Sequence, residues 1–262
     1  MSDLHPESIV EDGLKEMRQY YAEFCDKQKG SVAVRNFLVD AFSDEAVLLR
    51  YLIGRKYRPK HAWDTLRSYA EVRFDKYPEM FPAVLPPKEY LFCENKPIFG
   101  ILKERDSKGR RIAYFQLSGW DTDKCSLEEL SILTLPIFER ALCDEDCLNN
   151  GLIFIQDGSG MGMAHAKHYT MRAMLRYLNI YWYSFPMKVK GVYFVNVPPF
   201  LTFLYAMIKP FLPKKLTERF LLSTTSRGFQ DLHVRLPPSI LPKCLGGTLD
   251  TDEAIDPQFL SL

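Results

Sequence analysis

The spacing of apolar positions changes near residue 77 of this 262-residue chain. Before that point apolar residues recur at helical spacing in three stretches, residues 8–25, 44–58 and 60–75. Asp44 suits a helix N-cap, and Pro59 suits a first helical position. We therefore predict a helical N-terminal region over residues 1–77. A proline-rich connecting stretch over residues 78–97 follows it.

Farther along, short apolar runs alternate with helical patterns. Strands are expected on both sides of a turn at Asp106–Gly109, and again at residues 151–157 and 189–197. Helices are expected over residues 126–143, where Ser126 and Glu129 have capping-box spacing, and over residues 164–183. This alternation predicts an α/β domain over residues 78–262, with a mixed, partly parallel β-sheet and helices packed against it.

The segment from residue 197 to residue 220 is unusual because its helix is apolar on every side. One face carries Phe200, Phe203, Leu204, Met207, Ile208 and Phe211, and the other carries Leu201 and Tyr205. Two interpretations are about equally favoured: a helix inside the core, or a helix that meets a non-aqueous phase. The surrounding stretch, residues 186–219, holds six basic residues and one acid, Glu218, which suits an anionic membrane surface.

Composition excludes several classes of protein. The chain is 47% hydrophobic and 26% charged with a formal net charge of +1, which argues against a nucleic-acid-binding protein. No run approaches the ~20 apolar residues of a membrane-spanning helix, and the polar N-terminus has no signal core. We expect a cytoplasmic protein that associates with membranes transiently and acts as a monomer. Its six cysteines should be reduced.

No arrangement of residues predicts catalysis. The sequence DGSGMG at residues 157–162 lacks the Gly-Lys-Ser/Thr ending of a phosphate-binding loop, so a glycine turn is favoured. His165 and His168 are three residues apart, but no carboxylate or cysteine at suitable spacing joins them as a metal ligand. We therefore expect no enzyme activity, no metal and no cofactor.

A helix with two apolar faces could close a cavity for a hydrophobic ligand. The candidate lining residues are apolar or aromatic and come from the predicted strands, the 164–183 helix and the 200–211 helix: Tyr114, Phe115, Leu117, Phe154, Ile155, Tyr177, Tyr181, Phe194, Phe203, Met207 and Phe211. Ordinary core packing is the alternative for each of them. Five polar residues are candidates for orienting a ligand head group: Tyr114, Ser118, Tyr177, Tyr181 and Ser184.

Several segments, taken in order, resemble one known family. The N-terminal part contains LLRYLIGRKY and HAWDTLRSY, and the middle contains GRRIAYFQLSGWD and LIFIQDGSGM. The C-terminal part contains SFPMKVKGVYFVNVPPFLTFLYAMIKPFLPKKLTERF and LPPSILPKCLGG. Together they resemble the CRAL-TRIO lipid-transfer family, and within it the branch of the alpha-tocopherol transfer protein and the retinaldehyde-binding proteins.

The resemblance implies a three-helix N-terminal region and a C-terminal domain whose helices enclose a hydrophobic cavity. It makes residues 198–221 a mobile helical gate, and it implies a phosphoinositide-binding basic cluster at Arg55, Lys188, Lys190, Lys215 and Arg219. Members that carry phosphatidylinositol usually have a glutamate where this chain has Met187, which argues against that lipid as the cavity ligand.

Two functions remain from the sequence. The favoured one is a non-enzymatic carrier that binds tocopherol, a retinoid or a similar isoprenoid and releases it at phosphoinositide-containing membranes. The alternative is a membrane-recruitment adaptor that binds phosphoinositides and keeps a structural lipid permanently in its cavity.

Overall fold

The chain forms two compact units in the computed structural model, which describes residues 6–259. The first unit comprises the chain up to Pro82 together with Arg176–Lys188, and the second comprises Ala83–Leu175 and the chain from Val189 onward. The sequence predicts a boundary at residue 77 and assigns residues 176–188 to the second domain. The structure instead packs that segment among the N-terminal helices.

The first unit is helical. Within its described residues it contains four α-helices: α1 (Pro6–Asp26), α2 (Val32–Ser43), α3 (Glu45–Gly54) and α4 (Pro59–Glu71). The π-helical turn η1 (Val72–Lys76), the 3-10 turn η2 (Pro78–Met80) and the π-helical segment η5 (Leu178–Ser184) complete it. The three-helix region implied by the resemblance is therefore wrong, and the pattern analysis also overlooked α2. The expected N-cap is confirmed: Asp44 accepts a hydrogen bond from the Ala46 N–H.

Close contacts explain why residues 176–188 belong to this unit. The Tyr69 ring of α4 packs edge-on against Phe185, with ring centroids 5.5 Å apart. Gly54 ends α3 so close to Pro186 that an added Cβ would lie 2.0 Å from the Pro186 carbonyl oxygen. The side chains of Ser68 and Ser184 are also within hydrogen-bonding distance, 3.0 Å apart.

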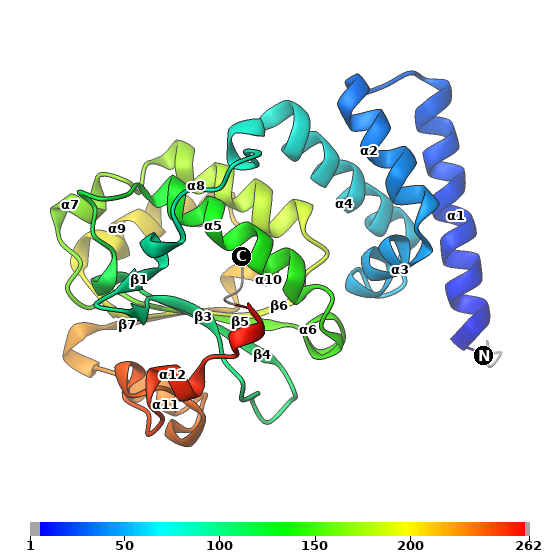
Figure 1. The fold of residues 1–262 in the computed structure, drawn as a ribbon. Coiled ribbons are helices and arrows are strands. Elements are labelled where there is room, and N and C mark those ends of the chain that lie inside the picture. Colours follow the sequence, from blue (N-terminus) through cyan, green and yellow to red (C-terminus); the bar gives the residue numbers. More distant parts are fainter. Residues whose placement is uncertain (1–5, 260–262) are drawn as a thin grey trace. The chain divides into compact units, whose positions relative to one another are not determined.

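The second unit is built on a five-stranded sheet of order β3-β4-β5-β6-β7 (Figure 1). The strands are β3 (Phe99–Ile101), β4 (Arg111–Gln116), β5 (Leu152–Asp157), β6 (Val189–Val197) and β7 (Phe220–Thr224). β3 and β4 are antiparallel across the predicted turn, and every later pair is parallel, so the predicted mixed, partly parallel sheet is confirmed. A small hairpin, β1 (Phe92–Cys93) and β2 (Lys96–Pro97), lies outside this sheet. The sequence does not predict β7.

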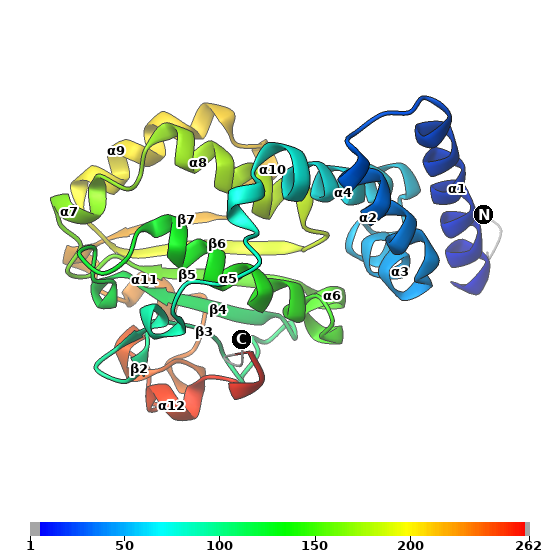
Figure 2. The same cartoon turned by 45° about the horizontal axis from the view of Figure 1, so that its top comes forward.

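Helices cover both faces of the sheet (Figures 1 and 2). α5 (Leu127–Ala141) and α9 (Pro199–Ile208) lie on one face, and the short helices α11 (Gln230–His233) and α12 (Thr251–Ala254) lie on the other. α5 begins with the predicted capping box between Ser126 and Glu129. The remaining elements are α6 (Glu145–Asn150), α7 (Met163–Ala166), α8 (Met171–Tyr177), α10 (Lys214–Thr217), and the 3-10 turns η3 (Lys88–Leu91), η4 (Leu117–Gly119), η6 (Lys209–Phe211), η7 (Thr225–Arg227), η8 (Pro238–Ile240), η9 (Lys243–Leu245) and η10 (Pro257–Phe259). The single helix predicted over 164–183 is in fact three elements, α7, α8 and η5.

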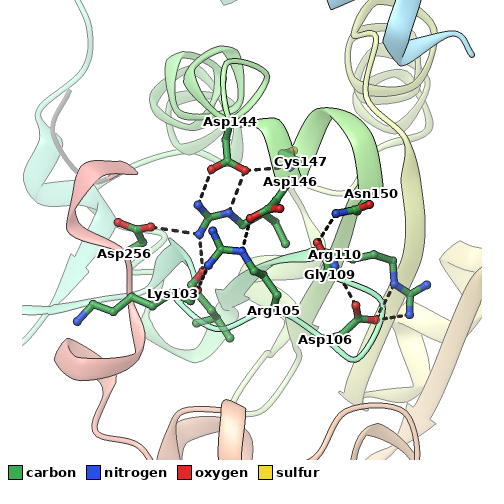
Figure 3. A network of polar contacts seen from close by, with 12 residues as sticks. Lys103, Arg105, Asp106, Gly109, Arg110, Asp144, Asp146, Cys147, Asn150 and Asp256 are labelled. Carbon is green, nitrogen blue, oxygen red and sulfur yellow. Dashed lines mark hydrogen bonds and ion pairs between the residues drawn. The ribbon is translucent and has the colours of Figure 1, made fainter. Parts of the chain in front are cut away.

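A buried arginine, whose partners Asp144 and Asp256 are labelled in Figure 3, ties the C-terminal segment to the sheet. Arg111, at the start of β4, donates to Asp144 at 3.1 Å and to Asp256 at 3.2 Å, and its side chain is 3% exposed. Asp144 also caps α6, so the Arg111 guanidinium links β4, α6 and the segment that contains Asp256. Backbone bonds from Lys103 N–H to the Ala254 carbonyl and from Asp256 N–H to the Ile101 carbonyl, both 2.8 Å, run beside β3.

Candidate ligand-binding face and membrane surface

The sheet of the second unit has two different faces because successive residues of a strand point to opposite sides. The face beneath α11 and α12 is a closed core. Its strand residues pack with the C-terminal leucines: Ile112, Tyr114, Ile153, Ile155, Tyr193, Val195, Leu232, Leu236, Leu241 and Leu245. The structure therefore places two of the predicted cavity residues, Tyr114 and Ile155, in this closed core.

The opposite face lies beneath α5 and α9, and we call it the aromatic face. The strand register places ten side chains on it: Phe99, Ile101, Ala113, Phe115, Phe154, Gln156, Val192, Phe194, Phe220 and Leu222. The side chains of Phe99, Ile101 and Ala113 are buried, whereas the other seven are only half-buried. Along β6 the alternation is regular: Gly191, Tyr193 and Val195 are buried, and Val192 and Phe194 between them are half-buried.

Two helices contact this face at different points. Phe138 of α5 packs against Phe99 and Phe154, with ring centroids 5.6 and 5.4 Å away. Tyr205 of α9 packs against Phe220 at 4.9 Å. The apolar surface is thus closed under α5 at the β3 side and retains accessible area toward α9. The face brings together three of the predicted lining residues, Phe115, Phe154 and Phe194.

The other predicted lining residues lie elsewhere. Leu117 is fully buried in η4. Tyr177 and Tyr181 belong to the first unit, where Tyr181 stacks on Phe185 at 6.0 Å. The three predicted from the 200–211 helix are exposed, as described next.

The outer side of α9 and η6 is apolar and faces solvent. Phe203 is 66% exposed, Met207 40% and Phe211 54%, and Leu201 is the buried residue of α9. Because these three side chains are four residues apart, they share one side of the helix, which we call the exposed stripe. The prediction that this helix is apolar on both faces is correct. The sequence could not tell which face points outward.

Arg55, the first member of the predicted basic cluster, points into the first unit. Its guanidinium donates to the Thr65 hydroxyl at 2.7 Å and to the carbonyls of Phe185, Trp182 and Met187 at 2.5, 3.3 and 3.4 Å. All four acceptors are neutral, and burial lowers the pKa of Arg55 to about 10. It thus holds the end of η5 in place. Lys188 belongs to the same unit.

The other predicted cluster residues, Lys190, Lys215 and Arg219, belong to the second unit and lie near the start of β7, where Lys214, which was not predicted for the cluster, joins them. Lys190 lies on β6, Lys214 and Lys215 are exposed on α10, and Arg219 directly precedes β7. Arg219 also donates to the Val189 carbonyl, and its own carbonyl accepts from the Val192 N–H at 3.0 Å. We call these four residues the basic patch.

The residues considered for catalysis or metal binding have structural roles. Asp157, which ends β5, accepts hydrogen bonds from the Ser159 N–H, the Ser159 hydroxyl and the Asn196 amide. His165 accepts from the Gly162 N–H and lies 3.1 Å from the Trp120 carbonyl oxygen. Among the described residues, no group of three or more His, Cys, Asp or Glu side chains is placed to hold a metal ion.

Two of the polar residues considered for a ligand head group are already paired. The Tyr114 hydroxyl donates to the Pro97 carbonyl at 2.8 Å, and burial raises the pKa of this phenol. The Ser184 hydroxyl donates to the Asn179 carbonyl at 2.8 Å. The sequence analysis overlooked Gln156, the polar residue of the aromatic face. The signal was its position as an amide directly after the apolar run LIFI, within β5.

Comparisons with known proteins agree with this architecture. The CRAL/TRIO domain model matches residues 95–247. The human alpha-tocopherol transfer protein-like protein is 30% identical over 213 residues, which cover 79% of this chain and 60% of that protein. Rat clavesin-1 is 31% identical over 210 residues, covering 79% of this chain and 58% of clavesin-1. The chain thus spans about 60% of the length of these relatives.

A solved structure extends the fold comparison to nearly the whole chain. The crystal structure of Sfh5 aligns with a TM-score of 0.57 over 98% of this chain and 93% of Sfh5, at 14% identity. No helix within residues 6–259 has the length and apolar character needed to cross a bilayer. The domain match and the relatives, together with the shared fold, show that this chain belongs to the CRAL/TRIO family.

Proposed function

We propose that this protein is a non-enzymatic carrier that binds one small hydrophobic molecule and moves it between membranes. The observation that carries the proposal is the aromatic face, where alternate side chains of the sheet stay half-buried beneath helices. Interior side chains of a covered sheet are ordinarily closed by close packing. A hydrophobic ligand would complete the burial of these rings. The tocopherol-related name of one set of relatives supports tocopherol or a similar isoprenoid.

A closed apolar site has a clear energetic purpose. Moving a lipid of about 20 carbons from a bilayer into water costs on the order of 16 kcal/mol, at about 0.8 kcal/mol per methylene. Spontaneous exchange is therefore slow, and a protein surface that replaces the bilayer offsets this cost. α9 suits the role of a gate, because Tyr205 contacts the aromatic face while Phe203 on the same helix faces solvent.

Docking at a membrane would use the exposed stripe together with the basic patch. Exposed apolar side chains insert into the interfacial region of a bilayer, and each nearby cation adds roughly 1 kcal/mol of attraction to anionic lipid. Phosphoinositides, with their high negative charge, are the membrane component that best fits the basic patch. The patch alone would equally suit a phosphoinositide-binding adaptor, so ligand exchange has to decide between the two functions.

The decisive experiment is exchange of a bound molecule. Purified protein is incubated with neutral vesicles that contain deuterated tocopherol, retinol or phytol, and then studied by native mass spectrometry. A carrier takes up one labelled molecule and gives it back to unlabelled vesicles. An adaptor binds phosphoinositide vesicles while its own lipid stays in place. Recovery of protein without any hydrophobic ligand, from all three vesicle types, refutes the carrier.

The docking part of the proposal has a separate test. Replacing Lys214 and Lys215 by Ala should weaken binding to phosphoinositide vesicles by about 2 kcal/mol, roughly 30-fold, with ligand affinity unchanged. Lys88 and Lys96 are also exposed lysines of the same unit, and their double Ala variant is the matched control. Equal losses in the two double variants would mean that net charge, rather than the basic patch, drives vesicle binding.

A further inference from the structure

The strand that leads into α9 is irregular at Asn196. This residue is the last but one of β6, yet its φ is +52°, a left-handed value that differs from the extended backbone of a strand. The pairing of β6 with β7 shifts at the same place, because residues 195 and 196 lie between two pairs that Ser223 alone separates on β7. Such a β-bulge bends a strand and redirects the chain that follows it. The chain that follows here is α9.

The Asn196 side chain is fixed by the end of the neighbouring strand. Its amide donates to the Asp157 carboxylate at 2.7 Å, and both residues are buried. The same carboxylate oxygen accepts from the Ser159 N–H and hydroxyl, at 3.1 and 2.8 Å. The Gly158 N–H donates to the Val195 carbonyl at 2.9 Å, and a Cβ at Gly158 would lie 3.0 Å from the Asn196 carbonyl oxygen. The glycine turn at residues 157–162 therefore packs directly against the bulge.

The backbone between Asn196 and α9 has little freedom to rotate. Pro198 and Pro199 have φ angles fixed by their rings, and a residue that precedes a proline is restricted to extended conformations. That restriction applies to Val197 and to Pro198, whose φ and ψ are −70° and 156°. Asparagine, in contrast, adopts both left-handed and extended conformations. Asn196 is therefore the last residue before α9 at which the chain can change direction.

We propose that Asn196 is the hinge on which α9 opens, and that its hydrogen bond to Asp157 holds α9 over the aromatic face. The inference rests on the gate role proposed for α9 and names the residues that control it. Rotation of Asn196 out of the left-handed region would redirect α9 and pull the amide away from the carboxylate. A hydrogen bond to a charged acceptor is about twice as strong as one between neutral groups, so this bond opposes the rotation.

Hydrogen–deuterium exchange of the protein without added ligand tests the hinge. Asn196→Gly removes the amide and leaves the left-handed backbone free of strain. Its matched control is Asn95→Gly, because Asn95 also has a positive φ, +65°, and lies in the turn between β1 and β2, outside the five-stranded sheet. The amides of α9 should exchange about tenfold faster in N196G, the low end of the worth of a hydrogen bond to a charged group. Exchange in N95G should equal that of the wild type.

A second variant grades the effect. Asp157→Asn keeps an acceptor oxygen opposite Asn196 without the charge, so the amides of α9 should exchange about threefold faster. Equal exchange of α9 in N196G and the wild type overturns the hinge. An increase in β4 and β5 as large as that in α9 also overturns it, because Asn196 would then stabilise the whole sheet rather than the closed position of α9. An equal increase of α9 exchange in N95G has the same consequence.

Transfer of deuterated tocopherol, retinol and phytol between vesicles measures the effect on function. A hinge that governs opening speeds uptake and release alike, so both rates should rise about tenfold in N196G while the equilibrium share of ligand on the protein stays the same. Faster release with unchanged uptake would mean a weakened binding site and overturns the inference. If none of the three compounds is transferred but α9 shows the expected exchange, the carrier function is refuted and the hinge stands.

Discussion

The exposed stripe on α9 makes a strong prediction, because apolar side chains that face water gain free energy when a membrane removes them from it. We consider the substitution Phe203→Ser. Phe203 is the most exposed member of the stripe, at 66%, and no ring contact holds it within the described part of the chain. The substitution should therefore leave folding nearly unchanged and act on membrane binding.

The size of the effect follows from the exposed area. A phenylalanine presents about 200 Å², so 66% exposure leaves about 130 Å² to be removed from water. At about 25 cal/mol per Å², complete insertion of this area would contribute about 3 kcal/mol. A helix lying in the interface buries its apolar side incompletely, so half of this value, about 1.5 kcal/mol or roughly a tenfold change in partition coefficient, is expected.

The assay is flotation with vesicles at several lipid concentrations, from which partition coefficients are obtained. Val234 is 87% exposed and lies just beyond α11, on the other side of the sheet, so Val234→Ser is the matched control. F203S should bind about tenfold more weakly than the wild-type protein, and V234S should bind equally well. The reasoning is refuted if F203S binds as the wild type does, or if V234S loses as much as F203S.

Two further predictions concern stability. Gly54→Ala should destabilise the protein by about 3 kcal/mol in urea unfolding, because its Cβ would lie 2.0 Å from a backbone oxygen, whereas Gly162→Ala, with open space around its Cβ, should be nearly neutral. Burial acts to raise the pKa of Asp144, but the hydrogen bonds from Arg111 and from a backbone N–H outweigh it and lower the pKa. Its carboxylate therefore stabilises the fold above about pH 4, and that contribution is lost as the pH falls further. Asp144→Asn should lower stability at pH 7 and flatten its decline below pH ~4 relative to Asp146→Asn; equal slopes in the two variants would contradict this.

Local signals were sufficient to predict much of the fold. The capping box of Ser126 and Glu129 needs only its own residues, and the turn at Asp106–Gly109 needs a glycine that tolerates a φ of +68°. β7 could not be predicted in this way. Its five residues begin two residues after the basic helix α10, and their strand conformation depends on pairing with β6, a contact distant in sequence.

In the candidate site, too, local sequence was informative only where no contact distant in sequence decides the structure. The sequence groups Phe115, Phe154 and Phe194 as candidate lining residues, and the strand register places all three on the same face of the sheet. It cannot separate them from Tyr114 and Ile155, because a strand that is apolar on both faces has no polar residue to mark its outer side. The sequence also gives no sign of the carbonyl partners of Arg55 at residues 182–187, because they are more than 120 positions away.

The backbone hydrogen bonds that Ala254 and Asp256 make beside β3 have a practical consequence for truncated versions of this protein. β3 is the outermost strand of the sheet, and these two residues satisfy backbone groups at Lys103 and Ile101 that would otherwise be unpaired. Removing them would expose the unpaired edge of β3 to neighbouring molecules, and an exposed strand edge commonly leads to aggregation. Affinity tags and cleavage sites are therefore better placed ahead of α1 than within the last dozen residues.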